Sequence, residues 1–324
     1  MKALALISGG LDSALAAGLI QSQGIEVVGL YFQIPFSNCE REMLSSLRIQ
    51  IKYIDIKEKF LGLLENPRYG FGSNMNPCID CKIMMLKEAG GLMKELSADF
   101  VITGEVLGQR PMSQNRQALE LIAKRAGLGG LLLRPLSALL LSETLPEKQG
   151  WVNRDKLLNF SGRGRKPQME LAKKLNITDY PNPAGGCLLT DPGFARRLKE
   201  LMAHQELNTA NIELLKIGRH FRLSCNTKLV VGRNEKENEQ LISLAKENDY
   251  LFSPNEELAG PTSLGRGVFD GELIKVACQI TCRYCDLNNS TGGADILYKK
   301  IPLGETTIFQ AVPIAEDGLR SLCI

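Results

Sequence analysis

The fold is decided by residues 2–23, which read KALALISGGLDSALAAGLIQSQ. The apolar run from Lys2 to Ile7 has the length of a buried strand, and the stretch from Ser13 to Gln23 has the apolar spacing of an amphipathic helix. Gly24 closes that helix. A strand followed at once by a helix predicts the first half of a βαβ unit, with a two-glycine turn between the two elements.

The same alternation continues through the first third of the chain. Apolar runs at Glu26 to Phe32, Ile51 to Ile56 and Phe100 to Thr103 indicate further strands, and a helix is expected from about Lys82 to Leu96. Strands that alternate with helices favour a mainly parallel sheet with helices on both faces. We therefore predict an α/β fold with a doubly wound parallel sheet of the nucleotide-binding kind.

The turn between the first strand and the first helix, residues 8–13 with the sequence SGGLDS, has the features of an anion site. Glycines allow the backbone to approach an anion closely, and the helix N-terminus presents unpaired N–H groups. The chain contains neither the G-x-x-x-x-G-K-[ST] motif nor a G-x-G-x-x-G dinucleotide fingerprint here. An ordinary turn, in which Gly-Gly gives the bend and Ser or Asp caps the helix, is the alternative.

The segment SGGLDS resembles the S-G-G-x-D-S motif of the PP-loop ATP-pyrophosphatases, which cleave ATP to AMP and pyrophosphate. The resemblance implies an adenine nucleotide alpha-hydrolase-like fold that uses ATP and Mg²⁺, with the acidic residue helping to hold magnesium. It also implies that the end of the second strand lies beside the adenine. The nucleotide-binding residues implied in these two segments are Ser8, Gly9, Gly10, Leu11, Asp12, Ser13, Leu30, Tyr31 and Phe32.

The cysteines are the second strong signal, because nine of them accompany only two histidines. Cys78 and Cys81 form a C-x-x-C pair just before the expected helix, and this position lowers thiol pKa and suits metal or redox chemistry. Two thiolates do not complete a metal site. Cys187, at the end of a Pro- and Gly-rich loop, is the natural third ligand. Three unrelated buried cysteines are the alternative.

The order and type of these cysteines resemble the tRNA thiolases of the PP-loop superfamily, the 2-thiouridylases and the 4-thiouridine synthetases. The resemblance implies that Cys78, Cys81 and Cys187 bind a [4Fe-4S] cluster whose fourth iron is open to sulfide, and that they are catalytic together with Asp12. A persulfide mechanism, which needs only Cys81 and Cys187, is the second interpretation. The number of available ligands favours the cluster.

Residues 103–114, TGEVLGQRPMSQ, follow the expected fourth strand, and ligands bind at the carboxyl ends of strands in such sheets. Similar T-G-E-x-x-G-Q-R segments occur in thiolase-like PP-loop proteins. The resemblance implies that Gly104, Glu105, Gln109 and Arg110 bind the nucleotide or its metal, with Arg110 meeting phosphate. A loop whose polar groups satisfy one another, with a surface arginine, is the alternative.

A basic loop lies further along, at residues 161–167 with the sequence SGRGRKP. It opens a helix expected at about Gln168 to Leu175. Arg163, Arg165 and Lys166 are candidates for contacts with RNA phosphates or with pyrophosphate. A solvated basic turn is about as good an interpretation.

Cys278, Cys282 and Cys285 have the C-x3-C-x2-C spacing of a radical-SAM cluster loop, but too little chain follows for the barrel that this chemistry requires. On a helix these spacings put all three thiols on one face. A packed stripe of small buried residues is the favoured interpretation. A second metal site, completed by Cys225, is the alternative.

The wider C-terminal region contains VGRN at residues 231–234, EN at 237–238 and GPTS at 260–263. These segments resemble the small RNA-binding domain of ribosome quality-control proteins of the NFACT group, although the usual His-containing stretch is missing near residues 250–253. A basic face is expected there, with plain surface positions as the alternative for half of its members. Its candidate residues are Arg219, Arg222, Lys228 and Arg233.

The composition and patterning indicate two domains, residues 1–205 and a smaller α+β domain at residues 216–324. The apolar start of the chain is interrupted by glycines and Asp12, unlike a signal peptide, and the stretch from Leu128 to Leu141 is too short to cross a bilayer. We expect a cytoplasmic protein without membrane association. The net charge of +3 is too small to identify a nucleic-acid binder by itself.

Together these features predict an ATP-dependent tRNA sulfurtransferase. The enzyme adenylates a uridine carbonyl oxygen and replaces it with sulfur carried by the cluster or by a cysteine persulfide. The expected partners are tRNA, a sulfur donor, either sulfide or a sulfur-carrier protein, and a second copy of the chain in a homodimer. A PP-loop ligase or amidase acting on a small molecule and a non-enzymatic RNA-binding protein are the alternatives.

Overall fold

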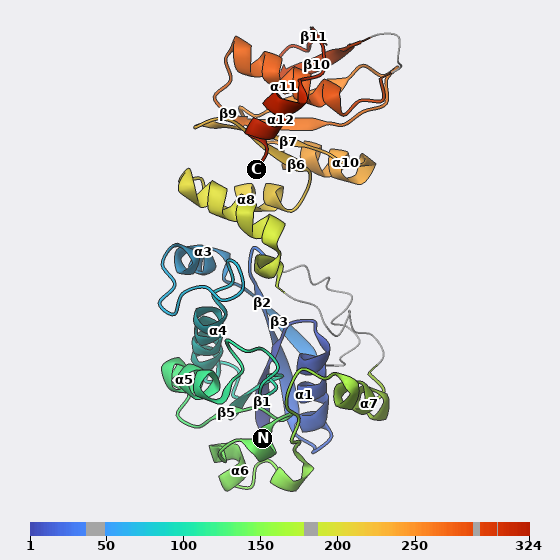
Figure 1. Ribbon diagram of the computed structural model, residues 1–324. Helices are drawn as coiled ribbons and strands as arrows, with labels where there is room; N and C mark the ends of the chain where they lie inside the picture. Colours follow the sequence, from blue (N-terminus) through green and yellow to red (C-terminus); the bar gives the residue numbers. More distant parts are fainter. Residues whose placement is uncertain (37–48, 178–186, 288–291, 303) are drawn as a thin grey trace. The chain divides into compact units, whose positions relative to one another are not determined.

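The computed structural model describes residues 1–36, 49–177, 187–287, 292–302 and 304–324 (Figure 1). The chain divides into two units, Met1–Asp191 and Pro192–Ile324. The division falls earlier than the range 205–215 expected from the sequence. The reason is that Glu200 in helix α8, Pro192–Ala203, forms ion pairs with Arg222 and Lys228 of the second unit.

The first unit contains a five-stranded parallel sheet in the order β3-β2-β1-β4-β5. The strand order reverses beside β1, so the crevice between the ends of β1 and β4 is the switch point at which such sheets bind ligands. The expected doubly wound parallel sheet is confirmed. Its strands are β1 Lys2–Ile7, β2 Glu26–Gln33, β3 Gln50–Asp55, β4 Phe100–Thr103 and β5 Leu132–Leu133.

Helices cover both faces of this sheet, with α1 and α7 on one side and α4 and α5 on the other (Figure 1). The described helices of the unit are α1 Leu11–Gln21, α3 Lys57–Glu65, α4 Cys78–Leu92, α5 Arg116–Ala126, α6 Leu145–Lys148 and α7 Lys166–Lys174.

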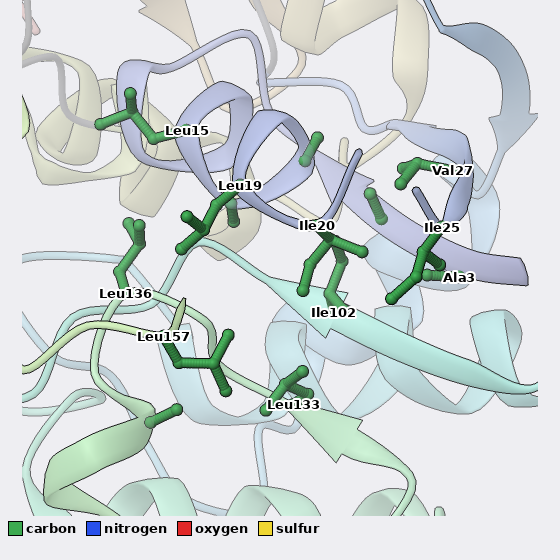
Figure 2. Packing of buried hydrophobic residues seen from close by; sticks show 14 of the residues in the cluster. Ala3, Leu15, Leu19, Ile20, Ile25, Val27, Ile102, Leu133, Leu136 and Leu157 are labelled. Atoms are coloured by element: carbon green, nitrogen blue, oxygen red, sulfur yellow. The ribbon is translucent and has the colours of Figure 1, made fainter. Parts of the chain in front are cut away.

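Strand β1 shows why both faces are covered. Ala3, Ala5 and Ile7 pack into the core under α1, whereas Leu4 and Leu6 pack into the core under α4 and α5. Successive side chains of a strand point to opposite faces, so a fully apolar strand needs a partner layer on each side. Figure 2 shows the first of these cores, in which Leu15, Leu19 and Ile20 of α1 meet Ile102 and Leu133 of the sheet.

Helix α4 begins earlier than the sequence predicted. Its first residue is Cys78 and its last is Leu92, whereas the expected range was Lys82 to Leu96. Pro77 precedes the helix, and proline is tolerated at such a position because the N–H groups of the first turn have no intrahelical partner. The C-x-x-C pair therefore lies in the first turn of α4 and not before it.

The second unit is an α+β unit built on a six-stranded sheet in the order β11-β10-β8-β9-β7-β6, with antiparallel pairing throughout. Its strands are β6 Arg219–Ser224, β7 Thr227–Val231, β8 Tyr250–Pro254, β9 Ser263–Gly267, β10 Ala294–Lys300 and β11 Thr307–Ala311. After α8 its helices are α9 Thr209–Leu215, α10 Glu235–Leu244, α11 Gly271–Arg283 and α12 Glu316–Leu322.

Apolar residues lie on both faces of the second sheet. Phe252 and Ile296 pack with α11 on one face, whereas Val230 and Leu264 pack with Leu214 of α9 on the other. In the part of the chain that the structure describes, no helix has the length and apolar character needed to cross a membrane.

Candidate functional site

The SGGLDS segment connects β1 to α1 at the switch point of the first sheet. Gly9 has a φ of 76°, a left-handed conformation that glycine adopts without strain. The Ser13 hydroxyl donates to the carbonyl of Gly10 over 2.8 Å and accepts from the N–H of Ser8 over 3.3 Å, so the two ends of the loop are tied together. The side chain of Leu11 is buried in the core. This geometry leaves the helix N-terminus as an anion site.

Asp12 is held from two sides by groups far away in the sequence. Arg165 Nη1 lies 2.5 Å from Oδ2 of Asp12, and Nε2 of Gln109 donates to the same oxygen over 2.7 Å. The other carboxylate oxygen, Oδ1, is buried and has no hydrogen-bond partner among the described residues. A buried carboxylate oxygen without a donor fits a cation as its partner.

A second glutamine stands behind Gln109. The Nε2 group of Gln168 donates to Oε1 of Gln109 over 3.4 Å, and Gln168 is buried at the start of α7. The two amides therefore form a directed relay that ends on Asp12. The sequence reasoning missed Gln168, because its burial beside Ala172 on the packed face of α7 is a property of the fold that no motif marks.

Gly104 and Glu105 follow β4 and differ in what they do. A Cβ on Gly104 would overlap the backbone of Asp12 and Ser13, so this position allows the strand end to touch the loop. Glu105 is buried in an ion pair with Arg134, whose Nε lies 2.9 Å from Oε2, and it also accepts from the hydroxyl of Thr103. Glu105 thus forms an internal ion pair beneath the site, and a direct nucleotide contact stays a prediction.

Burial alone would raise the pKa of the Glu105 carboxyl. The opposite charges of Arg134 and Lys82 and the hydrogen bonds from Arg134 and Thr103 outweigh burial, so the pKa lies below its usual value. Glu105 is therefore ionised in the folded protein.

The strand expected beside the adenine ends at the correct edge of the sheet, because Tyr31 pairs with Ile7 next to the loop. The side chains of Leu30, Tyr31 and Phe32 are all buried in the two cores of the unit. An adenine contact from this strand, which stays a prediction, would therefore come from its backbone.

Cys78, Cys81 and Cys187 are neighbours. Besides burial, which is the main cause, the nearby Cys78 and Cys187 raise the pKa of Cys81, and Cys78 also raises the pKa of Cys187. Two hydrogen bonds pin the segment after Cys187 to the segment before Cys78: Met75 N–H to the Leu189 carbonyl, 3.2 Å, and Asn74 Nδ2 to the Thr190 carbonyl, 2.7 Å. The three cysteines that the sequence grouped therefore lie in one region of the first unit, and their joint role as ligands or catalytic groups stays a prediction.

The protonation of these thiols is set first by burial, which raises the pKa of Cys81 to about 12 and also raises that of Cys187. The positive charges of Lys82 near Cys81 and Arg110 near Cys187 act in the opposite direction. Both cysteines are therefore neutral thiols at pH 7 in this structure. Among the described residues, no three Cys, His, Asp or Glu side chains lie in an arrangement that would hold a metal ion.

Residues 104–114, here called the bridging loop, reach both parts of the site. Gln109 binds Asp12, the charge of Arg110 acts on Cys187, and the sulfur of Met112 fills the place that a Cβ on Gly72 would take. The basic loop is attached to the bridging loop through the N–H of Gly162, which donates to the carbonyl of Leu107 over 2.8 Å. The SGGLDS segment, residues 8–13, is called the phosphate loop from here on. The bridging loop thus links the phosphate loop, the region of Cys187 and the basic loop that contains Arg165.

The basic face expected in the second unit is mostly satisfied internally. Arg222 forms two 2.9 Å bonds with the carboxylate of Glu206, and Lys228 Nζ lies 2.9 Å from Glu200. Arg219 lies over the ring of Tyr284, with Cζ 4.5 Å from the centroid, and Arg233 binds the carbonyl of Gly218. Arg222 and Lys228, two of the four candidates for the basic face, are therefore held in ion pairs within the second unit.

The cysteines of α11 and of the residues just after it form the packed stripe that the sequence favoured. Cys278, Cys282 and Cys285 are buried in the core between α11 and the sheet, whereas Cys225 is exposed. Burial raises the pKa of Cys278 and of Cys285 to about 12. A second metal site with Cys225 has no support in this arrangement.

A parallel sheet with SGG-x-DS at its switch point is the arrangement that the resemblance to the PP-loop class predicts. Two family models match the chain, one in each unit. Residues 1–140 match the family described as thiamine biosynthesis protein (ThiI), and residues 218–321 match the family described as NFACT protein RNA binding domain.

Individual relatives agree with these matches. The tRNA-specific 2-thiouridylase MnmA of Helicobacter hepaticus is 36% identical over 118 residues, which are 32% of this chain and 34% of the relative. A probable tRNA sulfurtransferase of Thermococcus kodakarensis is 29% identical over 150 residues, 43% of this chain and 37% of the relative. The chain thus spans about a third of the length of these curated relatives.

Among solved structures, a 4-thiouridine synthetase–RNA complex with bound ATP matches 66% of this chain and 52% of its own chain, with 20% identity and a TM-score of 0.37. The sequence matches confirm both resemblances that the motifs predicted. The first part of the chain is similar to the PP-loop tRNA thiolases, and the C-terminal part is similar to the NFACT RNA-binding domain.

Proposed function

We propose that this protein is an ATP-dependent tRNA sulfurtransferase that acts on a uridine base. The observation that carries the proposal is the bridging loop, which contacts the phosphate loop through Gln109 and approaches Cys187 through Arg110. An enzyme that couples ATP cleavage to sulfur transfer needs its phosphate site and its thiols within reach of one substrate. A non-enzymatic RNA-binding protein would use neither of them.

The first half of the proposed reaction takes place at the phosphate loop. The uridine carbonyl oxygen attacks the α-phosphorus of ATP, and pyrophosphate leaves toward the N–H groups of the α1 N-terminus. Arg165, which lies beside Asp12, is placed to neutralise charge on the departing pyrophosphate. Mg²⁺ fits the unpartnered Oδ1 atom of Asp12 and would supply further charge neutralisation there.

The second half replaces the activated oxygen by sulfur. A nucleophilic sulfur attacks the adenylated carbon, and AMP leaves with the former carbonyl oxygen. In the persulfide version, the terminal sulfur of a persulfide on one of Cys81 and Cys187 attacks. The thiol of the other cysteine then attacks the Sγ atom of the persulfide cysteine and breaks its bond to the transferred sulfur, so the thionucleoside leaves and a disulfide between the two cysteines remains for an external thiol to reduce.

A [4Fe-4S] cluster held by Cys78, Cys81 and Cys187 is the other source of sulfur in the proposal. The described residues do not bring three ligands into a metal-binding arrangement, and the persulfide version needs the thiols alone. Iron content measured after anaerobic purification, with the absorbance of the cluster, decides between the two versions. Iron at cluster stoichiometry that is lost in Cys78→Ala supports the cluster.

The partners belong to the same proposal. The similarity of residues 218–321 to an RNA-binding domain supports tRNA as the substrate. The proposed sulfur donor is sulfide in the cluster version, and in the persulfide version a sulfur-carrier protein whose own persulfide transfers sulfur already at that oxidation level. The proposed working form is a homodimer in the cytoplasm.

The experiment that tests the function combines the purified chain with tRNA, ATP and Mg²⁺, with sulfide in one reaction and a low-molecular-weight persulfide in a parallel reaction. We expect AMP, pyrophosphate and one thiolated nucleoside, identified by mass spectrometry of the digested tRNA. Cys187→Ala should lose the thionucleoside and keep ATP binding, whereas Cys225→Ala, at an exposed cysteine of the second unit, should behave as the wild type. A small-molecule ligase would instead keep full activity without Cys187, and that outcome would reject the proposal.

A further inference from the structure

A cavity lies inside the second unit, outside the site described above. It has a volume of about 150 Å³ and lies between helices α8 and α9 on one side and strands β7 and β9 on the other. Leu201, Leu214 and Val230 form its apolar wall. An apolar cavity of about this volume accepts a ring of the size of benzene.

The rest of the lining is polar, and most of it is already occupied. Glu206 uses both carboxylate oxygens on Arg222, and Arg266 binds the carboxylate of Asp249 and the amide oxygen of Asn211. These side chains are therefore fixed in place before any ligand arrives. The polar edge of the cavity is preformed and is not assembled by the ligand.

Lys228 is the group with bonding capacity left. Its side chain is buried, with 6% of the residue exposed, and the residue is part of the cavity lining. An ammonium group has three hydrogens, and in the described part of the chain Nζ makes one hydrogen bond, to Glu200 over 2.9 Å. An acceptor in the cavity would take a second of these hydrogens.

The charges around the cavity balance. Lys228, Arg266 and Arg222 are paired with Glu200, Asp249 and Glu206. An anion such as phosphate would find no unpaired positive charge, and burying its charge here would be costly. The cavity instead suits a neutral planar ring that has an apolar face and a carbonyl oxygen.

We propose that this cavity takes one unstacked pyrimidine base of a single-stranded RNA segment, with a base carbonyl accepting from Nζ of Lys228. The inference rests on the RNA-binding part of the proposed function. Proteins read single-stranded RNA by splaying bases into pockets and binding their edges. A purine has two fused rings and needs more space than the single ring that a cavity of this volume is known to accept, so we expect pyrimidines to bind more tightly.

Two substitutions test the cavity in the full chain. Lys228→Met removes the donor, and Leu214→Phe fills the space while leaving every polar group in place. We expect each to weaken binding of a short oligouridylate by about tenfold or more. Losing a hydrogen bond from a charged group, or blocking the space for the base, each removes at least the binding free energy that corresponds to a tenfold change in affinity. The matched controls are Lys236→Met and Ile242→Phe, at exposed positions of α10 in the same unit.

The binding assay compares oligouridylate, oligocytidylate, oligoadenylate and an abasic oligomer, by fluorescence anisotropy. Tighter binding of the pyrimidine oligomers, lost in Leu214→Phe, supports the proposal. Equal affinity for all four oligomers, or no loss in Leu214→Phe, overturns it. Thermal unfolding checks that the variants are folded. If Lys228→Met is unfolded, the binding result of Leu214→Phe alone tests the proposal.

Free uridine separates this inference from the proposed function, because the nucleoside needs the cavity but no wider RNA surface. If uridine shifts the NMR signals of the Leu214 and Val230 methyl groups but no RNA oligomer binds, the cavity is a pyrimidine site and the RNA-binding part of the proposed function is wrong. Uridine and oligomers that both leave these methyl signals unchanged show a cavity that holds water only, and the inference is then lost.

Discussion

The amide of Gln109 donates to Oδ2 of Asp12 over 2.7 Å, and through this bond the bridging loop fixes the acidic residue of the phosphate loop. The two residues are 97 positions apart in the sequence. Because Arg165 binds the same oxygen, Asp12 is held in an orientation that leaves Oδ1 free among the described residues. The nucleotide site is therefore assembled from three separate segments.

Gln109→Leu should weaken Mg²⁺-dependent ATP binding by about 10–100-fold, the usual loss when a partner that orients a metal-binding residue is removed. Gln117→Leu, at an exposed position on α5, is the control for the chemical change. Calorimetric titration with a non-hydrolysable ATP analogue, with and without Mg²⁺, measures the effect. Wild-type affinity in Gln109→Leu would show that the bond to Asp12 does not orient the site.

Arg165→Met should lower ATP affinity and the rate of pyrophosphate release together, because a side chain beside Asp12 is lost on the side where the phosphates are expected. Arg163→Met, two residues earlier in the same loop and exposed, should leave ATP binding unchanged. Release is followed with a coupled pyrophosphate assay. If both variants bind ATP and release pyrophosphate equally well, Arg165 is part of a solvated basic turn, the alternative that the sequence allowed.

Sequence reasoning could find the phosphate loop and the first sheet because their signals are local. A buried strand, two glycines and a helix are written in consecutive residues, and β4 has the bounds Phe100–Thr103 that the apolar run predicted. The three thiols were joined by type and order alone. Contacts such as Arg165 with Asp12, which are 153 positions apart, have no periodic pattern behind them.

Two residues have partners that the sequence did not reveal. Glu105 pairs with Arg134, the residue after β5, inside the protein, and its contact with the nucleotide stays a prediction. Lys228 was a candidate for the basic face, yet it is buried, and its ion pair with Glu200 makes that burial tolerable. In each case the deciding partner is distant in sequence, and composition does not reveal it.

Arg134→Met should destabilise the first unit by about 3–5 kcal/mol, because it leaves the Glu105 carboxylate buried without its partner. Lys52→Met breaks an exposed pair with Glu95 and should cost less than about 1 kcal/mol. The only tryptophan, Trp151, packs near Phe100, so its fluorescence in urea reports this unit. Equal costs for both variants would contradict the role given to the buried pair.

The same pair gives a pH dependence of known sign. The pKa of Glu105 is lower in the folded protein than its ordinary value of 4.5. Its contribution to stability is therefore complete above pH 4.5 and is lost as the pH falls through the folded-state pKa. Urea unfolding of the wild type between pH 7 and pH 3 should show this loss, and Arg134→Met, in which the stabilising charge is gone, should not.

Cys278→Ser should destabilise the second unit by about 1–3 kcal/mol, because a hydroxyl at a fully buried apolar position loses its bonds to water. Cys323→Ser, at an exposed position, should stay within about 0.5 kcal/mol. Calorimetric unfolding measures both. If the wild type contained a stoichiometric metal that was absent from Cys278→Ser, the hypothesis of a second metal site would instead be supported.

Gly104→Ala should abolish ATP binding while leaving the first unit folded. The added Cβ would overlap the backbone of Asp12 and would lie 2.5 Å from the nitrogen of Ser13, so the end of β4 must move away from the phosphate loop. Backbone atoms of a helix N-terminus cannot yield as a flexible side chain would, and the amides that bind phosphate would move with them.

Gly91→Ala is the matched control for this change. Gly91 lies near the end of α4 with no atom within 4 Å of an added Cβ, so alanine there should raise stability, by up to about 1 kcal/mol, through its higher helix propensity. Calorimetric titration of both variants with the ATP analogue, after Trp151 fluorescence has confirmed folding, makes the comparison. Undiminished ATP affinity in Gly104→Ala would mean that the contact between β4 and the loop does not shape the phosphate site, and the phosphate would then have to be placed elsewhere along the switch point.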